Sequence, residues 1–427
     1  CYCSKIMNLI FSKKFLFITL IVSLSLKILI SFYFGDEYLV DEWEILIENL
    51  IKFNKLSYYN INGESIPSAF MPPLYIFFLY PFFLTGLDEV ILVKIILIVQ
   101  SVISITSVII FFNICKIFFN KRISIILTYI FLFYPLNFYS STQISSITLQ
   151  LFLFCSFIFL LFEFNKNKNF IFFGIISGLM MLIRGEFYIL FFICLIMFIS
   201  RKFNITKILL SSLICILIVS PYLFRNYSIF NEIIITKSSG YNLWRGNNIY
   251  SDVNGKVDIH TDKNGITHNE ELYPNLNFDK QLIVNKLIAH QELNKYEIIL
   301  DNYYKNRALN NIKENPKKYF KLYIEKFFSY LLFNYNSNYA KYFELPSIVP
   351  EILVSILFVI GFFVNLFSKQ KNIYLLTLIS FYLLIIPIFF ILPRYKLFIL
   401  PLMIIYIGYF LHFIISKGFF QNNNKVE

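Results

Sequence analysis

The chain alternates long apolar runs with short polar segments, a pattern that predicts membrane-spanning helices. A helix of roughly 20 apolar residues crosses a ~30 Å hydrocarbon core. Ten runs approach this length, at residues 15–34, about 90–113, 123–140, 145–163, 170–183, 187–200, 207–224, 347–367, 372–392 and 397–416. A further Pro-rich run at 72–86 has only fifteen residues, so we expect it to lie at the membrane interface rather than cross.

The composition agrees with an all-α polytopic membrane protein. Of the 427 residues, 57% are hydrophobic and only 15% are charged, which is more apolar surface than a soluble domain can bury. The first run follows basic residues but lacks a small-x-small cleavage site, so we interpret it as a retained anchor rather than a cleaved signal peptide. The net charge of +12 accompanies no basic groove or motif, which argues against a nucleic-acid partner.

The distribution of Lys and Arg predicts the orientation, because cytoplasmic loops are enriched in both. If 72–86 does not cross, the segments on the side of the N-terminus are basic, whereas the short turns on the other side carry only Arg184, Arg394 and Lys396. We therefore expect both termini in the cytoplasm of a bacterium and the protein in its inner membrane. The predicted parts are 1–34 (cytoplasmic N-terminus, first span), 35–89 (first outer loop), 90–224 (spans two to seven), 225–346 (large outer segment) and 347–427 (spans eight to ten, cytoplasmic tail).

The large outer segment has two predicted halves. Its first half contains turn signals such as Ser239-Gly240 and Asn254-Gly255. In its second half, Asp279 to Asn315 predicts one or two amphipathic helices, and 317–333 predicts a basic, aromatic helix that could lie on the membrane surface. We therefore expect a mixed, mostly helical segment.

Candidate chemistry gathers at the outer ends of the predicted spans. The first outer loop begins with five carboxylates, at Asp36, Glu37, Asp41, Glu42 and Glu44. Basic residues stand at the outer ends of other spans, at Lys94, Arg184 (beside Glu186), Arg225 and Arg394. Arg binds phosphate with a planar fork, and a carboxylate can deprotonate a hydroxyl, so this combination suits a phosphate-bearing lipid substrate. The alternatives are a solvated acidic loop and cations that reach lipid headgroups.

The sequence contains no motif typical of a metal site or of soluble-nucleotide chemistry. The four His residues do not cluster with Cys at metal-ligand spacing, so no zinc site is expected, and the use of a divalent cation stays open. The chain has no P-loop, GxGxxG or G-x-S-x-G motif, which argues against a soluble-nucleotide enzyme and an ATP-driven pump.

Several short stretches, in order along the chain, are similar to the motifs of one group of membrane enzymes. They are residues 41–50 (DEWEILIENL), 71–75 (MPPLY), 182–186 (LIRGE), 221–227 (PYLFRNY), 240–248 (GYNLWRGNN), 308–326 and 394–396 (RYK). Together they resemble the GT-C membrane glycosyltransferases of the protein mannosyltransferase and aminoarabinose transferase superfamily. The resemblance implies about ten spans and sugar transfer from a polyprenyl-phosphate donor to a glycolipid, glycan or protein acceptor on the outer face.

The resemblance also implies roles for single residues. Asp41 is the expected base, with Glu42 next and Asp36 as the fallback. The residues expected to bind substrate are Lys94, Arg184, Glu186, Arg225, Trp244, Asn247, Asn248, Arg394 and Tyr395. Two departures concern activity: residues 139–150 (YSSTQISSITLQ) lack the acidic residue that family members often carry, and Met71 stands where aminoarabinose transferases have Lys.

Three alternatives to this function remain open. A transporter or flippase would have inverted repeats and interrupted helices with polar residues at mid-membrane, and we find neither in the sequence. A polymerase or ligase of lipid-linked glycans would share the outer Arg residues without needing the acid of the first loop. A cell-envelope scaffold would need neither.

Overall fold

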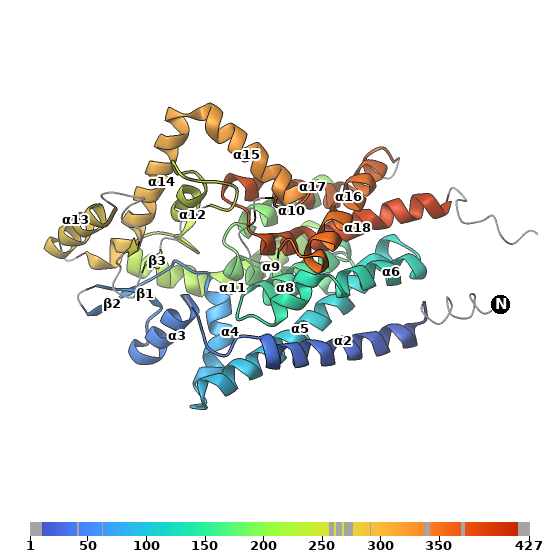
Figure 1. The fold of residues 1–427 in the computed structure, drawn as a ribbon, viewed down its shortest axis with the longest axis horizontal. Helices are drawn as coiled ribbons and strands as arrows, with labels where there is room; N and C mark the ends of the chain where they lie inside the picture. Colours follow the sequence, from blue (N-terminus) through green and yellow to red (C-terminus); the bar gives the residue numbers. More distant parts are fainter. Residues whose placement is uncertain are drawn as a thin grey trace, which may run out of the picture.

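The computed structural model describes residues 11–40, 42–61, 63–255, 260–261, 267–268, 276–290, 292–335, 337, 342–368 and 372–416. Most of these residues are in helices, which Figure 1 shows in chain order from blue to red. Of the described helices, five are long and apolar enough to cross a membrane: α2 (Lys13–Phe34), α5 (Glu89–Phe118), α11 (Ile205–Phe230), α16 (Leu345–Leu366) and α18 (Lys396–Ser416), the last preceded by the 3-10 turn η3 (Pro393–Tyr395).

Shorter apolar helices fill the other predicted runs. They are α6 (Lys121–Leu132) with α7 (Pro135–Ser141), α8 (Ile147–Phe162), α9 (Asn169–Ile183), α10 (Phe187–Ser200), and α17 (Ile373–Ile385) with the 3-10 turn η2 (Ile386–Ile388). The axis bends by 55° between α6 and α7, where Pro135 cannot continue the hydrogen bonding of α6. Several of these helices are shorter than a ~30 Å core requires, so the total of ten spans stays a prediction.

The Pro-rich run forms α4 (Pro73–Phe83), a helix of 11 residues. At about 1.5 Å per residue it is about 16 Å long, too short to cross a membrane alone. Tyr75, Ile76 and Leu79 are buried against the neighbouring helices. One face of the helix therefore packs into the fold, whereas Phe77 on another face is 47% exposed, and its place at the membrane interface stays a prediction.

The remaining elements belong to the two outer segments. They are α3 (Glu42–Phe53), the antiparallel hairpin β1 (Ser57–Ile61) and β2 (Glu64–Pro67), α12 (Ser239–Gly246), the paired strands β3 (His260–Thr261) and β4 (Thr267–His268), α13 (Leu276–Ala289), the 3-10 turn η1 (Leu293–Lys295), α14 (Tyr296–Glu314) and α15 (Pro316–Leu331). Helices α13 to α15 form where the amphipathic and basic-aromatic patterns predicted them. The β1–β2 hairpin was not predicted, although an Asn-Gly pair at 62–63 is a hairpin signal.

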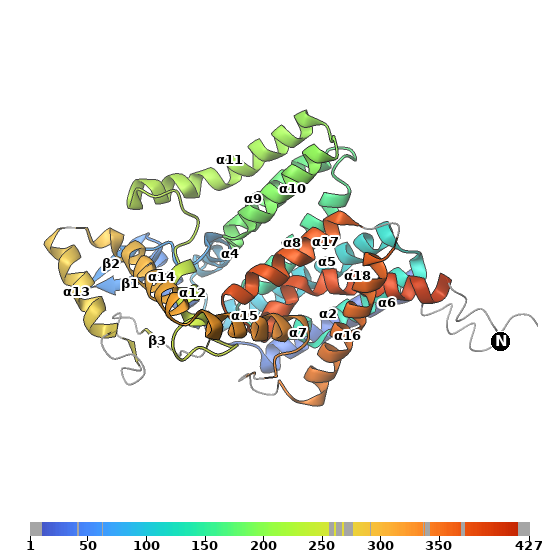
Figure 2. The ribbon, with the colours of Figure 1, turned by 90° about the horizontal axis from the view of Figure 1, so that it is seen from above.

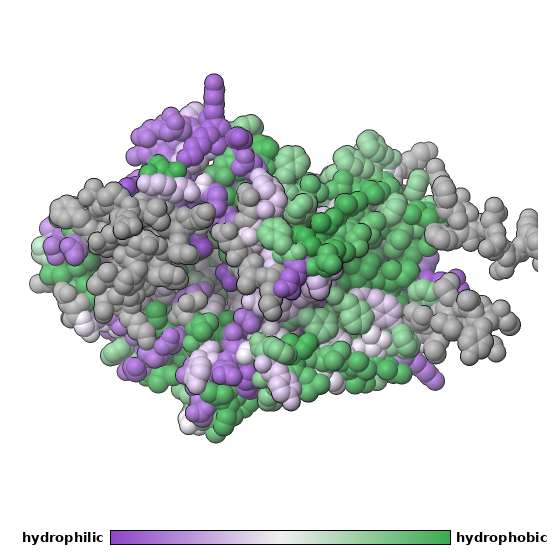
Figure 3. Space-filling view, viewed as in Figure 1, coloured by the Kyte–Doolittle hydropathy of each residue, from purple (hydrophilic) through white to green (hydrophobic). Residues whose placement is uncertain are grey.

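The two ends of the molecule differ in character. In Figure 1 the N-terminal end of α2 and the C-terminal end of α18 lie together at the right, and the elements of both outer segments lie at the left. The space-filling view shows an apolar surface over the helices at the right and hydrophilic residues over α14 at the top left (Figure 3). This arrangement places both outer segments at one end of the helices, as the charge pattern predicts; the side of the membrane stays a prediction.

Glycines allow the closest helix contacts. Seen from above, α9, α10 and α11 lie side by side (Figure 2), and α9 also packs against α8. Helix α11 packs along α9 at Gly174, where a Cβ would lie 2.4 Å from the Ser211 carbonyl oxygen. Helix α16 packs on α18 at Gly361, where a Cβ would lie 2.0 Å from the Tyr406 carbonyl oxygen. Small residues allow this approach in membrane helices generally.

A substitution at Gly361 tests this packing. We expect Gly361→Ala to destabilise the protein by about 1–3 kcal/mol, because the added methyl group forces α16 away from α18. The measurement is thermal unfolding of the purified protein in detergent. Ile360→Ala, at a residue that is 39% exposed, is the matched control and should have a smaller effect. Equal unfolding temperatures for the two variants would contradict the close contact.

Candidate active site

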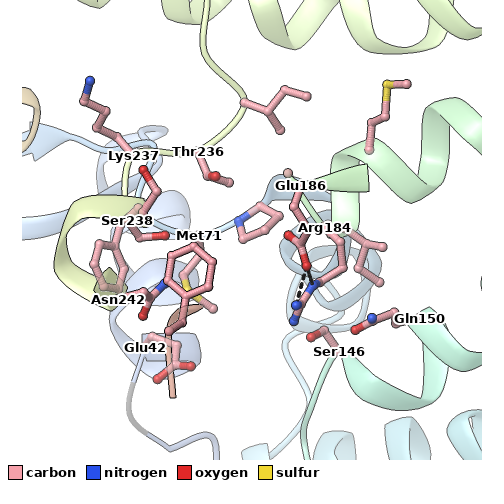
Figure 4. Close-up of a pocket in the computed structure, with 18 of the residues that line it drawn as sticks. Glu42, Met71, Ser146, Gln150, Arg184, Glu186, Thr236, Lys237, Ser238 and Asn242 are labelled. Atoms are coloured by element: carbon pink, nitrogen blue, oxygen red, sulfur yellow. Dashed lines mark hydrogen bonds and ion pairs between the residues drawn. The ribbon is translucent and has the colours of Figure 1, made fainter. Parts of the chain in front are cut away.

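The outer ends of the helices and the outer segments enclose a cavity of about 1470 Å³. Its wall comes from distant parts of the chain, within residues 36–45, 58–72, 136–150, 181–195, 212–245, 280–304 and 385–398. The lining includes six of the predicted site residues: Asp36, Glu42, Arg184, Glu186, Arg394 and Tyr395. Figure 4 shows Glu42 and Asn242 on one side of the cavity, and Arg184, Ser146 and Gln150 on the other.

Asp36 joins the first outer loop to the loop between α7 and α8. Its Oδ2 accepts a hydrogen bond from the Ile144 N–H at 2.7 Å, and its own N–H donates to the Thr142 carbonyl oxygen at 3.2 Å. Burial raises the pKa of Asp36, whereas the Ile144 N–H and the charge of Lys94 act in the opposite direction. The carboxylate of Asp36 is thus bonded to the very segment, 139–150, that has no acidic residue of its own.

The rest of the acidic stretch continues along the wall. Asp41, the expected base, lies outside the described residues. Val40 before it and Glu42 after it in the chain both line the cavity. Glu42 stands in the first turn of α3, where the helix dipole favours a carboxylate. Glu37 and Glu44 are not among the described residues that line the cavity.

Arginines face the cavity from two turns. Arg184 follows α9; its Nε donates to Glu186 Oε1 at 2.5 Å, and its guanidinium lies 4.4 Å from the centroid of the Phe398 ring. Arg394 lines the cavity from η3, and the neighbouring Tyr395 stacks on Phe398 at 5.3 Å. The aromatic ring of Phe398 therefore connects the two turns, although they are far apart in sequence.

Arg245 is a third arginine at the cavity, and sequence analysis did not assign it. Its Nε donates to the Gly255 carbonyl oxygen at 3.2 Å, and its guanidinium lies 4.5 Å from the centroid of Phe390. It belongs to the 240–248 stretch, in which we singled out its neighbours instead. Nothing in the helical spacing of this stretch distinguishes Arg245 from them, because only the tertiary fold decides which one faces the cavity.

Lys94 and Arg225 do not line the cavity but hold its wall. Lys94 Nζ donates to the carbonyl oxygens of Ser31 at 3.1 Å and Gly35 at 3.2 Å, at the C-terminal end of α2, where the helix dipole favours a positive charge. Arg225 donates to the carbonyl oxygens of Ser68 at 2.9 Å and Leu56 at 3.3 Å. The structure thus gives both residues contacts that position the first outer loop.

The three predicted residues of the 240–248 stretch also lie behind the wall. Trp244 is 1% exposed, and its ring centroid is 4.9 Å from that of Tyr304 in α14. Asn247 Nδ2 donates to the Ile388 carbonyl oxygen in η2 at 2.8 Å. Asn248 Nδ2 donates to the Trp244 carbonyl oxygen at 3.2 Å. Trp244 and Asn247 therefore fix α12 between α14 and η2, and Asn248 closes the end of α12.

An apolar arm of the cavity runs between three helices. Its lining comes from α9, α10 and α11, with Met181, Ile183, Phe191, Phe192, Leu195, Cys215, Ile216, Val219 and Leu223. Two of these side chains are well exposed, Phe192 at 58% and Ile216 at 60%. The cavity therefore has a charged part beside the outer segments and an apolar part between α9, α10 and α11. In the described chain, no three His, Cys, Asp or Glu side chains gather as a metal site.

Comparison with known proteins identifies this architecture. Residues 72–224 match the family model described as dolichyl-phosphate-mannose-protein mannosyltransferase. A search of curated protein sequences finds no match. Among solved structures, the crystal structure of the Archaeoglobus fulgidus oligosaccharyltransferase, tethered with an acceptor peptide containing the NVT sequon via a disulfide bond, is similar at a TM-score of 0.53 and 12% identity, over 98% of this chain and 52% of that chain. The chain has the GT-C glycosyltransferase fold.

The GT-C fold confirms the class predicted from the sequence motifs. The chain spans about half the length of the solved oligosaccharyltransferase chain, and the family match ends before the large outer segment. The family match covers less than half of the chain and the structural similarity shows the fold, so the activity and the roles of single residues are proposals.

Two buried carboxylates of the GT-C cavity were missed from the sequence. Glu297 Oε1 accepts a hydrogen bond from the Ala69 N–H at 2.7 Å and its Oε2 accepts one from the Ser68 hydroxyl. Asp301 Oδ1 accepts one from the Tyr241 N–H at 2.9 Å, at the start of α12. Both residues lie on the buried face of α14, spaced by four, with Tyr304 and Ala308 further along the same face. This periodicity is the signal that could have found them.

Glu297 predicts a pH dependence of stability. Burial raises its pKa from 4.5 to about 7. Between these values the folded protein binds more protons than the unfolded chain, so stability falls as pH rises from about 4.5 to about 7. We expect Glu297→Gln, which keeps an acceptor for the Ala69 N–H and cannot ionise, to flatten this slope in thermal unfolding measured across pH. Glu48→Gln, at an exposed residue of α3, should keep the wild-type slope. Identical slopes for wild type and Glu297→Gln would contradict the assignment.

Proposed function

We propose that the protein transfers a sugar from a polyprenyl-phosphate donor to an acceptor on the outer face of the membrane. The acceptor class is a glycolipid, a polysaccharide or a protein. One observation carries the proposal: three kinds of region line a single cavity. They are the carboxylates Asp36 and Glu42, three arginines, and an apolar arm between α9, α10 and α11. A lipid-phosphate sugar has parts that match all three regions.

The arginines suit the phosphate of the donor. Arg184, Arg245 and Arg394 come from three separate segments and face one space. A planar guanidinium group can bind two phosphate oxygens at once through two parallel N–H bonds. It also stabilises the negative charge that develops as the phosphate leaves. Arg184 is paired with Glu186 and lies over Phe398, which holds its guanidinium in place without fully neutralising this wall.

The apolar arm suits the lipid chain of the donor. Its lining is formed by aliphatic and aromatic side chains of α9, α10 and α11, of which Phe192 and Ile216 are well exposed. A polyprenyl chain that enters sideways from the bilayer stays in an apolar environment throughout. Its phosphate would then lie at the end of the arm near Arg184.

The acidic stretch suits the base. In the proposed step, an acceptor oxygen attacks the anomeric carbon of the sugar, the bond from this carbon to the phosphate oxygen breaks, and the bonding pair leaves with the lipid phosphate. A carboxylate of the stretch takes the proton of the acceptor hydroxyl. Asp41 remains the proposed base, because Val40 and Glu42 beside it in the chain line the cavity. We assign Asp36 to positioning, since its carboxylate is bonded to the Ile144 N–H.

Reconstitution tests the proposed reaction. Purified protein in proteoliposomes would be supplied with polyprenyl-phosphate sugars carrying a labelled sugar, and release of the label by transfer or hydrolysis would be measured. We expect release from at least one donor, about 10²–10⁴-fold slower in Asp41→Asn, and unchanged in Glu48→Gln. Absence of release from every donor would sink the proposal. Movement of the intact donor across the bilayer without release would point to a flippase.

A pair of arginine variants separates phosphate binding from structural support. Arg394→Gln should lower kcat/KM per folded molecule by about 10²–10³-fold, because its side chain lines the cavity. Arg225→Gln should mainly lower thermal stability, because it leaves the carbonyl oxygens of Ser68 and Leu56 without their guanidinium donor. If both variants lose stability equally and retain equal activity per folded molecule, Arg394 does not bind the phosphate.

A further inference from the structure

Gln150 is a buried amide that the proposed reaction has not used. It lies in the first turn of α8, is 2% exposed, and lines the cavity. Within the described part of the chain, its Oε1 has no hydrogen-bond partner. A buried acceptor that lacks a donor destabilises a fold, so each such atom calls for an explanation.

The surroundings of Gln150 are polar and already positioned. Ser146 precedes α8, lines the cavity, and makes no capping hydrogen bond with its side chain. In Figure 4 the amide of Gln150 points from α8 toward Ser146 and Arg184. The segment before α8 is fixed because the Ile144 N–H donates to Asp36. The end of α8 therefore presents an amide and a hydroxyl to the cavity from a rigid position.

The charges around this corner favour a neutral ligand. Arg184, which lies beside this corner in Figure 4, is paired with Glu186, so each side chain partly offsets the charge of the other. The amide of Gln150 and the hydroxyl of Ser146 carry no charge that would offset an ammonium group on a ligand. Sugar hydroxyl groups both donate and accept hydrogen bonds, so they match an amide oxygen and a serine hydroxyl without a charge.

We infer that Ser146 and Gln150 form the subsite for the transferred sugar, in which one sugar hydroxyl donates to Gln150 Oε1. The inference rests on the proposed function and deepens it by naming the sugar class. The subsite selects a neutral, hydroxyl-bearing sugar over a cationic amino sugar. The same geometry places the sugar beside Arg184, next to the proposed position of the phosphate.

A second buried glutamine provides a matched control for stability. Gln100 in α5 is 0% exposed, but its Oε1 accepts from the Tyr75 hydroxyl at 2.7 Å and its Nε2 donates to the Gln143 carbonyl oxygen at 2.8 Å. Gln100→Leu should lower the thermal unfolding temperature, because it removes the acceptor of the buried Tyr75 hydroxyl and the donor to the Gln143 carbonyl oxygen. Gln150→Leu should leave this temperature unchanged or raise it, because it removes an acceptor that had no donor. A comparable drop for both variants would indicate a structural role for Gln150 and overturn the inference.

Donor analogues test the contact directly. The probes are a polyprenyl-phosphate hexose that the wild-type protein turns over and its monodeoxy analogues, each lacking one hydroxyl. For one analogue we expect wild-type kcat/KM to fall about tenfold or more. With the complete sugar, Gln150→Leu should lower kcat/KM by a similar factor. With that analogue, Gln150→Leu should lower kcat/KM no further, because the substitution and the missing hydroxyl remove the same hydrogen bond. Gln150→Met, of similar length, serves as a second variant.

The outcomes distinguish this inference from the function on which it rests. The wild-type protein could turn over the donors while, for every analogue, the loss in kcat/KM from Gln150→Leu multiplies with the loss from the missing hydroxyl. This result would overturn the subsite and leave the proposed function standing. Faster turnover of an amino-sugar donor than of the matching neutral donor would also overturn the subsite. Absence of turnover with all polyprenyl-phosphate sugars would remove the proposed function and the subsite together.

Discussion

The hydrogen bond from the Ile144 N–H to the carboxylate of Asp36 is the contact on which the geometry of the cavity depends. Asp36 follows α2, whose last carbonyl groups are bonded by Lys94, and Ile144 precedes α8. Deeper in the bundle, Lys27 of α2 donates to the Asn137 carbonyl oxygen at 2.7 Å. These contacts attach α7, and the segment between α7 and α8, to the first long helix at two levels. Asp36 therefore brings a carboxylate to the segment between α7 and α8, which has no acidic residue of its own.

Buried carboxylates fix the second half of the wall in the same manner. Glu297 of α14 bonds the backbone before α4, and Asp301 bonds the start of α12. Burying a carboxylate costs solvation, which backbone N–H donors partly offset. The large outer segment is thereby attached to the first outer loop through its helices rather than through flexible turns. The cavity is the space that remains between these two attachments and the ends of the long helices.

The fold could be predicted well from the sequence, whereas the site could be predicted only in part. The reason is that helices depend on local composition and the cavity lining depends on tertiary packing. Apolar runs and charge asymmetry depend on local composition, so the helices lie where they were expected. Arg184 and Arg394 were identifiable because each interrupts an apolar run at a turn. Arg245 was not, because only tertiary packing decides which polar residue of α12 faces the cavity. Glu297 was missed, although the helical periodicity of α14 places it on the buried face. Trp244 and Asn247 belong to a motif that was identified correctly, yet their side chains hold α12 rather than line the cavity.

The central claim is that one cavity receives the lipid, the phosphate and the sugar of a polyprenyl-phosphate donor. The most direct test is a cryo-electron microscopy structure of the protein in lipid nanodiscs with such a donor bound. We expect the polyprenyl chain of the donor between α9, α10 and α11, its phosphate against Arg184, Arg245 and Arg394, and its sugar beside Gln150. Donor density at any other surface, with this cavity occupied only by solvent, would contradict it.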